Sequence, residues 1–234
     1  MSQKLGHIIL MLADVALLRL MQLISPGLPI GMYSYSQGLE RAIDDGWITN
    51  STELEEWISG VLQNNLCYLD AAYLARLYDA WLLSDYTAVY YWTEQLYASR
   101  ETYELRAEDR QTGQALARLL NQLEMPDAEN WLKRPETTLA TLFSLAAVRW
   151  QIDKKHTVTG YLWSWLENQV LCGVKLIPLG QVAGQQLLLK LAGRLPAIVE
   201  HSLMLTDHQL GGSAFGLALA SSRHEMQYSR LFRS

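Results

Sequence analysis

The chain has 234 residues, of which 50% are hydrophobic and 18% are charged, a composition that excludes intrinsic disorder. Its formal net charge of −5 also argues against nucleic acid as a partner, because nucleic-acid binding needs a basic stripe that replaces counterions around phosphates. Its two cysteines, Cys67 and Cys172, form no CxxC motif, so we expect neither a disulfide framework nor a zinc knuckle, and we expect a reducing, cytoplasmic environment.

Helical periodicity dominates the chain, which predicts an all-α, single-domain bundle of about eight to ten helices. The first helix is expected over residues 5–24. Its apolar stretch is short for a membrane span and is interrupted by Asp14 and Arg19, so we expect a buried amphipathic helix and no membrane association. The sequence SPGLPIG at 25–31 should end it, because its two prolines remove backbone donors.

The middle of the chain predicts three longer helical stretches. A second helix is expected over 34–45, and a third from about residue 51 toward 83, with Thr52 and Glu55 forming a capping box at its start. From 85 to 123 only Gly113 interrupts the pattern, which indicates either one long helix or two helices joined at a kink.

Further helices are expected over 135–152, 158–174, the stretch after the turn at 178–180, and 196–210. The sequence GGSAFG at 211–216 then predicts a flexible connection. We therefore divide the chain into a helical body, residues 1–220, and a flexible C-terminal tail, residues 221–234.

The tail is unusual for a terminus because it is rich in arginine and large apolar residues. If it became helical, Tyr228, Leu231 and Phe232 would share one face, the spacing of a helix anchored in a groove. The tail could instead pack back onto its own body as a last helix. These two interpretations are compatible.

Catalytic motifs are not found. His224 and Glu225 would begin an HExxH zinc motif, but the position of its second histidine holds Tyr228. The sequence GQVAGQQ at 180–186 lacks the lysine of a phosphate-binding loop, and His201 with His208 provides too few ligands for a metal site. We therefore expect no catalytic residue, metal ligand or cofactor, and a chain rich in Trp and Tyr that functions through interfaces.

Four segments together resemble the urease accessory protein UreF family. They occur in the family's order along the chain: LLRLMQLISPGLPIGMYSYSQGLE at 17–40, RETYELRAEDRQTGQAL at 100–116, YLWSWLENQVLCGVKLIPLGQVAGQQLL at 161–188 and HEMQYSRLFRS at 224–234. The resemblance implies an all-α urease maturation factor, a chaperone rather than an enzyme. It also implies a homodimer that joins UreD (also called UreH) and the GTPase UreG to deliver nickel to apo-urease, with nickel handled by the wider complex.

The resemblance further implies that the tail and the segment around SYS contact UreD. The residues expected there are Tyr33, Ser34, Tyr35, Arg223, Tyr228, Arg230, Leu231, Phe232 and Arg233. We expect Lys175 to contact UreG, because a lone lysine in an apolar run is costly unless it faces solvent or a partner. Simpler roles stay open: a helix cap at Ser34 beside a buried tyrosine, and a lysine that reaches solvent at a helix end.

A second function is that the protein regulates the GTPase activity of UreG, by stimulating or restraining hydrolysis. Arg106 or Arg110 would then act as an inserted arginine finger, a device that raises GTPase turnover by about 10³ to 10⁵. The alternative for these two arginines is a solvated position on a charged helix.

Overall fold

Eleven α-helices occur in residues 2–234, the part of the chain that the computed structural model describes; side chains are described from residue 13 onward. These residues contain no strand, so the predicted all-α class is confirmed, with one helix more than the expected range. The helices are α1 (Ser2–Leu23), α2 (Leu39–Asp44), α3 (Ser51–Val61), α4 (Asp70–Leu82), α5 (Tyr86–Ala98), α6 (Tyr103–Gln122), α7 (Leu139–Arg149), α8 (Lys154–Leu176), α9 (Gln181–Ala192), α10 (Leu195–Met204) and α11 (Phe215–His224).

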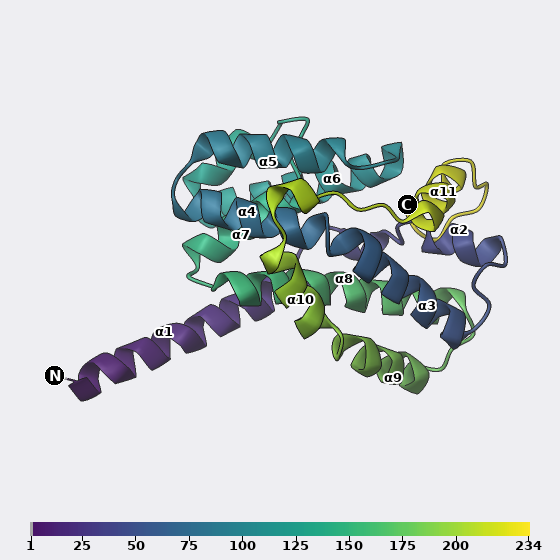
Figure 1. Cartoon of the computed structure of the whole chain (residues 1–234), viewed down its shortest axis with the longest axis horizontal. Coiled ribbons are helices and arrows are strands. Elements are labelled where there is room, and N and C mark those ends of the chain that lie inside the picture. Colours follow the sequence, from purple (N-terminus) through teal and green to yellow (C-terminus); the bar gives the residue numbers. More distant parts are fainter. Residues whose placement is uncertain (1) are drawn as a thin grey trace.

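The core forms around α4, which packs against α5, α7 and α8, while α6 packs against α7 (Figure 1). Leu74 and Leu77 of α4 are completely buried, and Trp81 on the same helix donates its indole N–H to the Thr141 carbonyl oxygen of α7 at 3.0 Å. A buried indole needs such an acceptor, so this contact fixes α4 against α7 while the ring fills the core.

We predicted that the first helix would be buried, but α1 projects from the bundle (Figure 1). Leu20 and Leu23 are buried where α1 meets the body, and Leu20 packs above Gly160 of α8. Over the rest of its described side chains, four large apolar residues are more than half exposed: Val15, Leu17, Leu18 and Met21. The prediction failed because periodicity identifies an apolar face and cannot show whether a second layer covers it. None of the helices described is long and apolar enough to span a bilayer.

Two predicted helices are shorter in the structure. Instead of a helix over 34–45, a 3₁₀ turn at Met32–Ser34 precedes α2, because Gln37 and Gly38 take positive φ angles of 52° and 76°. The stretch from 51 to 83 divides into α3, a π-helical turn at Leu62–Leu66 and α4. The predicted start near residue 51 is confirmed, but the predicted capping box is wrong: the Asn50 side chain caps α3 by accepting two backbone N–H groups.

The stretch from 85 to 123 forms two helices, and the break lies between α5 and α6, away from Gly113. The Thr102 side chain caps the new helix by accepting the Leu105 N–H. Gly113 lies inside α6, where a Cβ atom would be 2.6 Å from the Thr138 carbonyl carbon. The absence of a side chain at Gly113 therefore lets α6 cross the backbone just before α7.

We expect Gly113→Ala to lower the free energy of unfolding by about 1–3 kcal/mol, because the added methyl group overlaps backbone that cannot move independently. Gly60→Ala is the matched control: it changes a helical glycine whose Cβ would meet no atom within 4 Å. The control should gain about 0.5–1 kcal/mol from helix propensity. Urea unfolding followed by circular dichroism measures both, and equal effects would contradict the packing argument.

Candidate partner-docking site

The chain beyond α11 lies against the body without further helix, so the predicted helical face of Tyr228, Leu231 and Phe232 does not form. Tyr228 is fully exposed and Leu231 is 64% exposed, whereas Phe232 is 6% exposed and belongs to the core. The tail therefore packs back as one interpretation expected, although in an irregular conformation. The predicted flexibility of the tail is not shown. The predicted boundary after residue 220 falls inside α11, and the division of the chain into body and tail stays a prediction.

The tail is joined to the SYS segment by backbone hydrogen bonds. The Arg233 N–H donates to the Ser34 carbonyl oxygen at 2.9 Å, and the Ser36 N–H donates to the Ser234 carbonyl oxygen at 2.8 Å. The Ser36 hydroxyl donates to that same oxygen. The structure thus brings together the two segments that the sequence assigned to one partner, and we call residues 33–40 and 225–234 the tail junction.

Glu40 of α2 is a buried part of the tail junction that the sequence analysis missed. One of its carboxylate oxygens accepts the Leu231 N–H at 2.7 Å, and the other accepts the Phe232 N–H at 2.8 Å. Glu40 ends the SYSQGLE sequence, and an acid beside buried apolar positions of a short helix was the signal available. Buried carboxylates need such donors, and here the tail backbone supplies them.

His224, at the end of α11, is completely buried between two carboxylates. Its Nδ1 lies 2.8 Å from the carboxylate of Glu104, and its Nε2 lies 3.4 Å from that of Glu40. The other Glu104 oxygen accepts a hydrogen bond from Arg230 at 2.8 Å. Glu104 therefore joins the end of α11 to the tail through His224 and Arg230.

The tyrosines of the SYS segment are held by the body. The Tyr33 hydroxyl donates to Glu167 at 2.5 Å, and burial raises the pKa of Tyr33. The buried Tyr35 donates its hydroxyl to Gln111 at 2.8 Å. Ser34 does not cap a helix: its hydroxyl donates to the Gly31 carbonyl oxygen at 2.6 Å.

Lys175 lies at the tail junction, although the sequence assigned it to a different partner. Its ammonium group is 5.6 Å from the centre of the Phe232 ring, within the range of a cation–π contact, and its side chain is exposed. The predicted UreG contact and the predicted UreD contacts therefore adjoin.

The remaining arginines lie in different surroundings. Arg223 pairs with Asp45 at 3.0 Å and stacks on Trp47. Arg233 is exposed, and Arg106 donates to the Arg100 carbonyl oxygen, so the body holds that guanidinium. Among the side chains described, from residue 13 onward, no group of three or more His, Cys, Asp or Glu is arranged to hold a metal ion.

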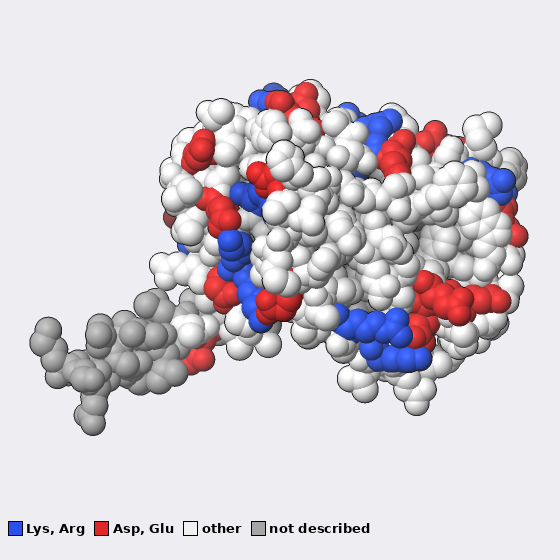
Figure 2. Space-filling model, in the orientation of Figure 1, with Lys and Arg blue, Asp and Glu red and all other residues white. Residues whose placement is uncertain are grey.

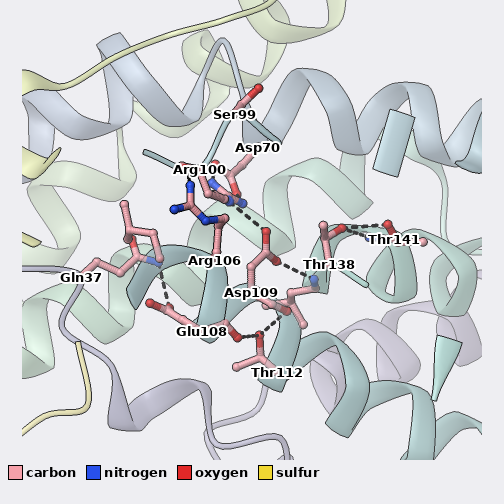
Figure 3. Close-up of polar contacts among 12 residues, drawn as sticks. Gln37, Asp70, Ser99, Arg100, Arg106, Glu108, Asp109, Thr112, Thr138 and Thr141 are labelled. Atoms are coloured by element: carbon pink, nitrogen blue, oxygen red, sulfur yellow. Dashed lines mark hydrogen bonds and ion pairs between the residues drawn. The ribbon is translucent and has the colours of Figure 1, made fainter. Parts of the chain in front are cut away.

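A cavity of about 40 Å³ is lined by both apolar and charged residues and includes Gln37 of the tail junction; Figure 3 shows several of its lining side chains. Arg100 projects inward and pairs with Asp70 at 2.7 Å and Asp109 at 2.8 Å. Glu108 accepts the Gln37 amide N–H at 2.9 Å and the Ser234 hydroxyl at 3.0 Å. The volume and the charged lining groups suit ordered water.

Burial raises the pKa of Glu108 to about 7, although the hydrogen bonds from Gln37 and Ser234 act in the opposite direction. Burial also raises the pKa of Asp109, and the Arg100 guanidinium opposes that shift. Charged groups of opposite sign are thus concentrated inside the bundle. On the face shown in Figure 2, acidic and basic side chains are also mixed, as over α3 and α9, where Lys190 pairs with Glu55.

Comparison with known proteins gives one consistent result. The family model described as UreF matches residues 48–192. A urease accessory protein UreF from Alkalilimnicola ehrlichii is 51% identical over 216 residues, which cover 92% of this chain and 95% of that protein. The proteins of the same name from Alcanivorax borkumensis and Teredinibacter turnerae are 48% and 47% identical, over 94% and 93% of this chain and 98% of each relative.

We expect Glu108→Gln to stabilise the protein increasingly as pH rises. The carboxyl group has a raised pKa, so between about pH 4.5 and 7 the folded chain holds a proton that the unfolded chain releases, and stability falls as pH rises through this window. The Glu108→Gln variant does not titrate there. Urea unfolding at pH 5 and pH 8 should show the variant's stability relative to wild type rise by about 2–3 kcal/mol; a constant difference would contradict the assignment.

Proposed function

This chain belongs to the urease accessory protein UreF family, and from that premise we propose that it joins UreD and UreG in the complex that delivers nickel to apo-urease. It is a urease accessory protein rather than an enzyme. The observation that carries the proposal is the tail junction, where the backbone of the tail is hydrogen-bonded to the SYS segment and Lys175 lies close to Phe232. The alternative is that the chain regulates the GTPase activity of UreG through an arginine finger at Arg106 or Arg110. Arg106 donates to the Arg100 carbonyl oxygen, which argues against that residue, and Arg110 is partly buried on α6.

The surface that we propose for UreD is formed by the exposed side chains of the tail. Leu231 is presented on a backbone held by a hydrogen bond to Glu40, and Tyr228 lies in sequence between His224 and Arg230, which both contact Glu104, so little conformational entropy is lost on docking. Arg233, also exposed, can supply forked hydrogen bonds to acceptors on the partner. Phe232 and Tyr35, which are buried, would shape this surface from beneath.

We further propose that Lys175 contacts UreG. Its charge is exposed at the end of α8 and is close to the tail, so UreG would approach beside UreD. An interface of standard size needs about 800 Å² from each partner, so Lys175 would be one contact among several. The protein would act as a homodimeric chaperone in the cytoplasm, without a cofactor of its own, while nickel is handled by the wider complex.

We expect Tyr228→Ala and Leu231→Ala each to weaken UreD binding at least about tenfold, because exposed aromatic and aliphatic anchors dominate such interfaces. Leu83→Ala is the matched control, since Leu83 is 77% exposed at the end of α4. Titration calorimetry with purified UreD measures the affinities. Unchanged affinity in both tail variants would remove the tail from the proposed interface.

Lys175→Ala should weaken UreG binding while leaving UreD binding unchanged, because it removes a single exposed charge. Lys190→Ala removes an exposed lysine on α9 and serves as the control. Pull-down of UreG by the preformed complex with UreD, at two salt concentrations, measures the effect. Equal loss of UreG binding in both variants would indicate a nonspecific charge effect and contradict the assignment.

A further inference from the structure

The backbone of the tail is fixed by two buried carboxylates that lie behind the surface it presents. Each oxygen of Glu40 accepts one backbone N–H, from Leu231 and from Phe232. Such charge-assisted hydrogen bonds are about twice as strong as neutral ones. Fixing two consecutive peptide groups also fixes which way their side chains point: Leu231 outward at 64% exposure and Phe232 inward at 6%.

Glu104 fixes the tail at the preceding positions. Its two oxygens contact His224, where α11 ends, and Arg230, just before the residues held by Glu40. The exposed Tyr228 lies between these two attachment points in sequence. His224 also faces Glu40, so both carboxylates belong to one buried arrangement.

The requirement for a carboxylate at position 40 is specific. Two backbone donors approach two different oxygens, and only a carboxylate has an acceptor on both atoms. A glutamine of the same shape would direct its amide hydrogens at one of the backbone N–H groups. The relative exposure of the Glu40 and Glu104 side chains is only 8% and 9%, so direct contact with a partner is not their main role.

We infer that Glu40 and Glu104 are positioning residues for partner docking, which hold Leu231 and Tyr228 in place without forming the interface themselves. This inference rests on the proposed function, in which the tail contacts UreD. It predicts that changing Glu40 affects binding only through the placement of Leu231.

The first test uses the isolated full-length chain. Hydrogen exchange at the Leu231 and Phe232 amides should be at least about tenfold faster in the Glu40→Gln variant, since each amide loses or weakens its acceptor. Glu225→Gln, an exposed substitution on the same tail, is the matched control. Equal exchange in the wild type and the Glu40→Gln variant, with helical content unchanged, would overturn the inference.

The second test is a double-mutant cycle measured as affinity for UreD. Leu231→Ala should weaken binding about tenfold in the wild type and hardly at all in the Glu40→Gln variant, because a displaced Leu231 has no contact left to lose. If Glu40→Gln prevents folding, the same cycle uses Arg230→Ala in place of Glu40→Gln and Tyr228→Ala in place of Leu231→Ala. Arg230 contacts Glu104 and its side chain is partly exposed, and Tyr228→Ala should then hardly weaken binding in the Arg230→Ala variant.

The outcomes separate the inference from the proposed function. A full tenfold effect of Leu231→Ala in the Glu40→Gln background would overturn the positioning role alone. A wild-type chain that fails to bind UreD would contradict the proposed function, and the docking role of the two carboxylates with it.

Discussion

Buried carboxylates must be hydrogen-bonded, and three of them in this fold obtain their donors from the C-terminal tail. Glu40 accepts hydrogen bonds from backbone N–H groups of the tail, Glu104 accepts one from the Arg230 guanidinium, and Glu108 accepts one from the Ser234 hydroxyl. Removing the tail would leave these carboxylates with unsatisfied oxygens inside the helical body. The tail is therefore a structural part of the domain as well as a candidate docking element.

This mutual dependence gives the proposed docking surface its physical basis. Apolar side chains on an unstructured arm would have to be ordered by the partner, which reduces affinity. Here the cost of ordering is already met within the fold, by hydrogen bonds to α2 and α6. The same hydrogen bonds hold Phe232 close to Lys175, so the surfaces proposed for UreD and UreG depend on the same buried contacts.

The helical class and the order of the elements could be predicted because periodicity, prolines and glycines act locally. Two helices over 85–123 were one expected outcome, but the position of the break between α5 and α6 was not predicted. There Arg100 pairs with Asp70 and Asp109, which are 30 and 9 residues away. The exposed face of α1 was missed because sequence does not show what covers a face. The tail was identified from its composition and the SYS segment by resemblance, whereas Glu40 was missed because its donors are backbone groups 191 and 192 residues away.

The most direct test is the activation of apo-urease in a defined mixture of UreD, UreG, GTP, bicarbonate and nickel. The mixture is assayed with the wild-type chain, with a chain carrying Tyr228→Ala and Leu231→Ala together, and without this protein. Full activity is expected with the wild type, and strongly reduced activity in the other two mixtures. Equal activation with and without the wild-type chain would contradict the maturation role, and equal activation by the two chains would contradict the role of the tail surface.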